Sequence, residues 1–121
     1  MKSLDALSIA KEVGGIFGLI QQDLKRDINS LCTELDIASQ KLARSAELLA
    51  DAQYIADVKR GEVAEENREE SATLLREIIT GKLADENRLL KQCEKLNSSL
   101  VHRIESIRSI LSAEKALSQL Q

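Results

Sequence analysis

The stretch LKRDINSLCTELDIASQKLARSAELLADAQYIA, from Leu24 to Ala56, decides the fold because its apolar positions recur at alternating steps of four and three. This spacing is the heptad pattern with which one face of a helix packs against another helix. The heptad seam of the stretch consists of Leu24, Ile28, Leu31, Leu35, Ala38, Leu42, Ser45, Leu49, Ala52 and Ala56. We therefore predict a long amphipathic helix whose pattern extends less regularly towards the N-terminus.

The first predicted break in the chain lies at Gly61, which directly follows two cations. Cations in the last turn complement the negative end of a helix dipole, and a glycine just beyond them can take the left-handed conformation that closes a helix. The next residues are rich in glutamate, and like charges four apart on a helix repel one another. We therefore predict a first helical arm of about residues 3–60 and a turn of about residues 61–66.

A second helical arm is predicted over about residues 67–120, because Asn67 stands three residues before Glu70 in the manner of a capping box. Asn97 lies in the heptad seam of this arm, where an asparagine either fixes the register of the helices or stays solvated at the edge of a bundle. Gly81 is interpreted as a helical glycine, and the rival interpretation makes it a second turn. The seam consists of Ala72, Ile79, Leu83, Leu90, Cys93, Asn97, Leu100, Ile104, Ile107 and Leu111.

Two arms of nearly equal length predict an all-α fold: one domain over residues 1–121, built as a long, coiled-coil-like antiparallel helical hairpin. If the turn lies near residues 63 and 64, residues at one level have numbers that sum to about 127. Leu35 would then lie beside Cys93, and Cys32 would lie at almost the same level as Cys93.

Two helices alone would leave apolar columns beside the seams partly uncovered, and such columns usually meet another helix. We predict that this partner-binding stripe completes a four-helix bundle, either by self-association or with a partner helix. The stripe consists of Leu48, Ile55, Leu75, Leu89, Leu96, Ile110 and Leu117.

Composition favours helices and argues against several classes of function. The chain has no proline and two aromatic residues, and its net charge of −3 argues against a nucleic-acid partner. No run of about eighteen apolar residues exists, so we expect no membrane-spanning helix. Two cysteines without a secretory signal indicate a reducing compartment, and we expect a cytoplasmic protein.

We predict no catalytic residue, no metal ligand and no cofactor. His102 is the only histidine, and the carboxylates near it are too scattered in the sequence to complete a metal site. Cys32 and Cys93 are interpreted as small apolar residues in a reducing cell rather than as a redox pair. The sequence has no nucleophile–base constellation and no glycine-rich phosphate loop, so we expect a protein that is not an enzyme.

Residues 85–111, DENRLLKQCEKLNSSLVHRIESIRSIL, resemble the last helix of flagellar and type III export chaperones. The resemblance rests on an Asn-Arg-Leu-Leu run before a heptad and covers under a quarter of the chain. It implies a small acidic helical protein that holds the terminal helix of a secreted partner.

Three hypotheses for function remain. The first is a coiled-coil structural subunit or adaptor that acts as a homodimer or in a hetero-oligomer, and the second is the export chaperone. The third is a membrane-active protein that uses VGGIFGLI, from Val13 to Ile20, which is too short to span a bilayer. In the preferred interpretation of this segment, Gly14 and Gly15 bend the helix or admit a close neighbour, while Phe17 joins the core.

Overall fold

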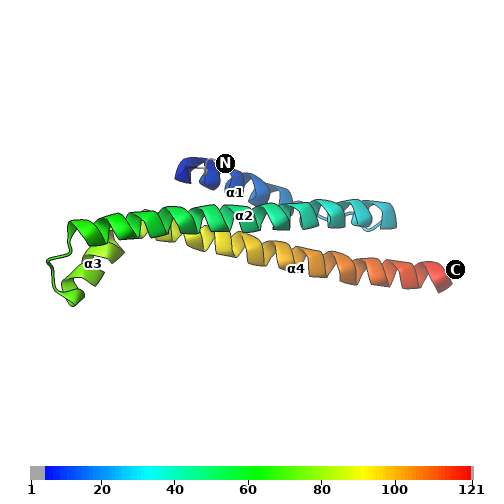
Figure 1. Cartoon of the computed structure of the whole chain (residues 1–121). Coiled ribbons are helices and arrows are strands. Elements are labelled where there is room, and N and C mark those ends of the chain that lie inside the picture. The colour runs from blue at the N-terminus through cyan, green and yellow to red at the C-terminus, as the bar shows by residue number, and fades with distance from the viewer. Residues whose placement is uncertain (1–4, 121) are drawn as a thin grey trace.

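The structure is a computed structural model that describes residues 5–120. Within this range it contains four helices and no strands, which confirms the all-α prediction, and the long helices pack against one another (Figure 1). The helices are α1 (Ala6–Ile20), α2 (Ile28–Glu66), α3 (Ala72–Lys82) and α4 (Ala84–Leu120). None of the helices in residues 5–120 combines the length and the apolar character needed to cross a bilayer.

The first arm is divided into α1 and α2, so the prediction of one continuous arm over residues 3–60 is wrong. Residues 3 and 4 of that predicted arm lie outside the described range. The reason is local. The Asp27 carboxylate accepts a hydrogen bond from the Ser30 amide at 2.8 Å, which satisfies a free amide at the start of α2. Asp5 caps α1 in the same way through the Ser8 amide at 2.7 Å.

The predicted turn at residues 61–66, with Gly61 as its turn residue, is also wrong. Gly61 lies inside α2, and no glycine in residues 5–120 has a positive φ. A glycine inside a helix costs only about 1 kcal/mol, and burial of Val63 two residues later favours continuation of the helix. The chain turns instead at residues 67–71, where Asn67 ends α2 rather than starting the second arm.

The second arm is interrupted at Leu83, two residues after the glycine that the rival interpretation made a turn. Gly81 itself remains in α3. Leu83 is fully buried, its amide donates to the Ile79 carbonyl at 2.9 Å, and its carbonyl accepts from the Asn87 amide at 2.9 Å. Backbone hydrogen bonds therefore bridge the interruption, and α4 continues the return path along α2 (Figure 1).

α2 and α4 form the main packing pair and run in opposite directions (Figure 1). Lys59 pairs with Glu86 at 2.5 Å near one end, and Glu34 pairs with Arg103 at 3.4 Å nearer the other. The predicted register is wrong. It places Lys59 level with Arg68, whereas Lys59 pairs with Glu86 in the structure. The true turn, at residues 67–71, lies further along the chain than the predicted one, and this difference displaces every level of α4 relative to α2.

The cysteines do not share an environment. Cys93 is completely buried among the leucines of α4, whereas Cys32 is exposed on α2, and both are free thiols. Burial raises the pKa of the Cys93 thiol, which makes it a poor nucleophile.

Ser45 is the only buried polar side chain in the described core, and its hydroxyl has no hydrogen-bond partner among residues 5–120. We expect Ser45→Ala to raise the free energy of unfolding by about 1 kcal/mol, because it removes a polar group that was desolvated without compensation. Thermal unfolding should show a rise in Tm of about 4 °C. Ser39→Ala, at an exposed position of α2, is the control. A lower Tm for Ser45→Ala would mean that the hydroxyl is satisfied.

Candidate functional site

Three of the seven residues that the sequence assigned to a partner are buried in an apolar cluster to which α1 contributes. Ile9, Val13 and Ile16 are buried in the same apolar cluster as residues of α2 and α4. That cluster includes Leu48, Leu89 and Leu96, which are 0%, 7% and 0% exposed. The expectation that these three leucines are uncovered is therefore wrong, because a third helix of the same chain packs over them.

The remaining residues of the predicted stripe have different environments. Ile55 and Ile110 are half-buried against the two apolar clusters, and Leu75 is half-buried on α3. Leu117 is 55% exposed near the end of α4. Asn97 is half-buried, and its proposed role in register stays a prediction. The seven positions therefore form no continuous open surface.

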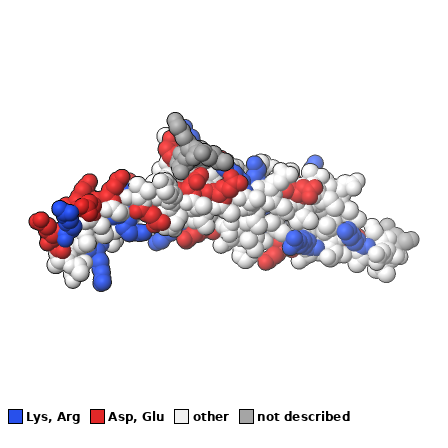
Figure 2. All heavy atoms as spheres, viewed as in Figure 1, with Lys and Arg blue, Asp and Glu red and all other residues white. Residues whose placement is uncertain are grey.

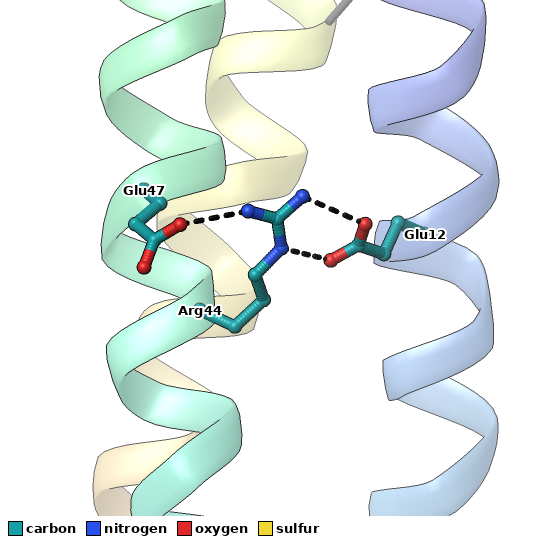
Figure 3. Close-up of polar contacts among 3 residues, drawn as sticks. All are labelled: Glu12, Arg44 and Glu47. Carbon is teal, nitrogen blue, oxygen red and sulfur yellow. Dashed lines mark hydrogen bonds and ion pairs between the residues drawn. The ribbon is translucent and has the colours of Figure 1, made fainter. Parts of the chain in front are cut away.

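An arginine joins α1 to α2 (Figure 3). The Arg44 guanidinium donates to both carboxylate oxygens of Glu12, with Nε–Oε2 at 2.5 Å and Nη2–Oε1 at 2.9 Å. Its Nη1 donates to Glu47 at 2.8 Å on the same face of α2. The bidentate contact between Arg44 and Glu12 fixes the orientation of α1 as well as its distance from α2.

A second arginine joins α4 to the end of α1. Arg103 Nη1 donates to the carbonyl oxygens of Ile20 at 2.8 Å and of Gln22 at 3.2 Å, and Nη2 lies 3.4 Å from Glu34 on α2. The carbonyls at a helix C-terminus carry partial negative charge, so a cation there is favourable. The Arg103 side chain is 12% exposed, and it ties three helices together at one point.

The Glu12–Arg44 contact predicts a pH dependence. Hydrogen bonds from Arg44 hold the pKa of the Glu12 carboxyl below its ordinary value of 4.5. A carboxyl whose pKa is lower in the folded state stabilises the protein above about pH 4.5, and this stabilisation is lost as the pH falls below that value. We expect Glu12→Gln to cost under about 1 kcal/mol at neutral pH, because the pair is partly exposed. The gap in Tm between wild type and Glu12→Gln should hold from neutral pH down to about pH 4.5 and narrow as the pH falls further. A gap that does not narrow as the pH falls would contradict the assignment.

An open groove with a volume of about 860 Å³ lies between α1 and α4. Each helix contributes one face to it, since the lining positions recur at steps of three and four. The α1 side and the following residues supply Ala10, Val13, Gly14, Phe17, Ile20, Gln21 and Leu24. The α4 side supplies Gln92, Lys95, Ser99, His102, Arg103 and Ser106. The α4 side spans residues 92–106, or about 21 Å of helix, whereas the α1 side spans residues 10–20 of the helix, or about 15 Å, and continues through Gln21 and Leu24 beyond its end.

Gly14 lines this groove on the α1 side and has no side chain to fill it. A Cβ added at Gly14 would meet no atom within 4 Å, and the same is true of Gly15 and Gly18 on the remaining exposed faces of α1. The expectation that Gly14 and Gly15 admit a close neighbour is therefore not met by any part of the described chain. The groove has room for side chains that residues 5–120 do not supply.

Charge is distributed unevenly over the molecule. Carboxylates gather at the end where α2 meets α3, while Lys and Arg side chains lie along α4 nearer the C-terminus (Figure 2). The groove lining contains Lys95, His102 and Arg103 and no Asp or Glu. His102 is 3.7 Å from Glu105, beyond hydrogen-bond distance, and residues 5–120 contain no cluster of three or more potential metal-binding side chains.

The α4 side of the groove was not predicted from the sequence. Gln92, Lys95, Ser99, His102 and Ser106 form a polar face at helical spacing, and that regularity was visible in the sequence. A polar helical face is ordinarily a solvated one, and only its position beside α1 makes it one wall of a groove. Comparisons with models of known protein families, with curated proteins and with solved structures found no match to this chain.

Proposed function

We propose that the chain is a non-enzymatic protein–protein interaction module, a structural subunit or adaptor that binds a helix in the groove between α1 and α4. The observation that carries this proposal is the match between two parallel-running faces at helical spacing and an unfilled volume of about 860 Å³ between them. Grooves of this kind accept the apolar face of an amphipathic helix.

The arrangement of the three packed helices supports the proposal. α1 runs opposite to α2, since Glu12 pairs with Arg44 while Gln22 lies near Glu34 through Arg103, and it therefore runs in the direction of α4. A further helix in the groove would lie on the side away from α2 and complete a four-helix bundle. The predicted bundle is kept in this proposal, but its open position differs from the predicted stripe. The occupant is a helix of another protein or of a second copy.

The chemistry of the groove favours binding over catalysis. Its lining includes one histidine and two serines, but no carboxylate orients the histidine at hydrogen-bond distance within the described chain. A nucleophile needs such a positioned base to become reactive. The proposal therefore assigns no catalytic residue and no cofactor.

The two alternative functions stay predictions. An export chaperone would use the same groove to hold a secreted partner's terminal helix, and the two hypotheses differ only in the partner. Burial of Val13 and Ile16, each 3% exposed, leaves the segment from Val13 to Ile20 with fewer free apolar side chains for a membrane than the sequence suggested.

The glycines of α1 supply a matched test. Gly14→Leu places a side chain in the groove, whereas Gly15→Leu places it on the other exposed surface of α1, and neither meets an atom within 4 Å at the Cβ. Both changes should stabilise α1 by about 0.5–1 kcal/mol, because leucine is a better helix former than glycine.

The readout is the titration of ¹⁵N-labelled protein with amphipathic peptides of about fourteen residues, matched to the groove length. Amide shifts at Lys95, Ser99 and His102 are expected for wild type and Gly15→Leu, and not for Gly14→Leu. If no peptide in the panel shifts these amides, or if Gly14→Leu binds as well as Gly15→Leu, the proposal is wrong.

A further inference from the structure

The groove has a charge opposite to that of the chain as a whole. The chain has a net charge of −3, yet the groove lining includes two permanent cations, Lys95 and Arg103, and no carboxylate. Because charged walls around an apolar cleft focus the local field, the sign of the lining affects which ligands enter it. This sign is a property of the site that the net charge does not reveal.

The two cations are not equivalent. Arg103 already donates to two carbonyl oxygens and lies beside Glu34, so its charge is partly satisfied within the chain. Lys95 is exposed and forms no ion pair among residues 5–120. No carboxylate stands three or four positions away from Lys95 on α4, where an internal partner would lie. Those positions are Lys91, Gln92, Ser98 and Ser99.

The opposite wall of the groove is apolar apart from Gln21. α1 and the residues after it contribute the side chains of Val13, Phe17 and Leu24 and the bare backbone of Gly14. A helix that fills the groove must therefore present an apolar stripe to α1 and a polar flank to α4. These two requirements describe an amphipathic helix whose rotation about its own axis is fixed by the two walls.

We propose that the occupant of the groove is an amphipathic helix of another protein whose flank facing α4 carries carboxylates. This inference rests on the proposed function and specifies the partner's chemistry. One carboxylate pairs with Lys95. A second, about seven or eight residues away on the partner, faces Arg103 and His102, because these lie that far along α4 from Lys95. Complementary charges of this kind choose between partners and speed their encounter more than they add affinity.

The test uses three synthetic peptides with one shared apolar stripe and with Glu, Gln or Lys at the two flank positions. Binding to the full chain is measured by fluorescence anisotropy at low and high salt. We expect the Glu peptide to bind about tenfold more tightly than the Lys peptide at low salt, and this ratio to fall to about twofold in 1 M salt. Lys95→Glu should reverse the order of the two peptides. Lys91→Glu makes the same charge change on α4 outside the groove lining and should preserve the order.

The outcomes separate this inference from the proposed function. If all three peptides bind equally and Gly14→Leu blocks their binding, the groove binds helices but the proposal that the partner has an acidic flank is wrong. If none binds, both proposals fail. Sedimentation of the chain alone gives one more result: a dimer that Gly14→Leu abolishes and Gly15→Leu does not would show that a second copy fills the groove, and would overturn the proposal of a separate acidic partner.

Discussion

Leu96→Ala is expected to lower the free energy of unfolding by about 3 kcal/mol, because Leu96 is fully buried in the cluster that joins α1, α2 and α4. Truncation of a buried leucine removes its transfer free energy and leaves a cavity that the neighbouring helices fill only in part. Urea unfolding followed by circular dichroism at 222 nm measures the change.

Leu117→Ala is the matched control, since Leu117 belongs to the same predicted stripe but is 55% exposed. Its effect should stay within about 0.5 kcal/mol. A similar small effect for both variants would mean that Leu96 is a surface residue, as the stripe hypothesis required, and that α1 does not cover it.

Ile16→Asp is expected to detach α1 from the rest of the molecule at a cost of at least about 3 kcal/mol, because it places an unpaired carboxylate in a position that is 3% exposed. Hydrogen exchange measured by mass spectrometry should show loss of amide protection in residues 9–20. Protection in the first part of α2 and the second half of α4 should remain, since the apolar cluster that joins them contains no residue of α1.

Leu7→Asp is the control for this variant. Leu7 is 66% exposed in the first turn of α1, where an acidic side chain is favourable to the helix dipole. Exchange in α1 should therefore stay close to that of wild type. If Ile16→Asp also leaves α1 protected, the buried face of α1 has been assigned to the wrong residues.

The sequence was sufficient to predict helices and most of the residues that pack between them. In the first seam Leu31, Ala38, Ser45, Ala52 and Ala56 are buried, as the heptad spacing predicted. In the second seam the positions from Leu83 to Leu111 are buried apart from the half-buried Asn97. A heptad repeat states which face of each helix is apolar, and this information is local.

The breaks between helices were predicted less well. The lysine–arginine–glycine run was interpreted as the end of the first arm and Asn67 as the start of the second, whereas α3 starts at Ser71, whose hydroxyl accepts from the Leu74 amide at 3.3 Å. Asp27, followed by Ser30, was an unused signal for the start of α2. Glycine inside a long helix is tolerated when the residues around it are packed, and a single sequence does not reveal that packing in advance.

The groove was not predictable from the sequence, because its walls are separated by about seventy residues and neither is unusual alone. Gly14 and Phe17 form part of one wall, and Lys95 and His102 part of the other. Arg44 and Arg103 set the position of α1 that brings the walls together. Ion pairs between distant helices depend on the register, and the predicted register was wrong.

The central claim is that α1 packs as a third helix over α2 and α4 and thereby forms one wall of the groove. The most direct measurement is a methyl NOESY spectrum of protein labelled at Ile, Leu and Val methyl groups. The account predicts cross-peaks between methyl groups of Ile9, Val13 and Ile16 and those of Leu48, Leu89, Leu96 and Leu100, which share one buried cluster. Cross-peaks from α1 that reach only its own residues, together with solvent-exposed shifts for Leu48 and Leu96, would contradict it.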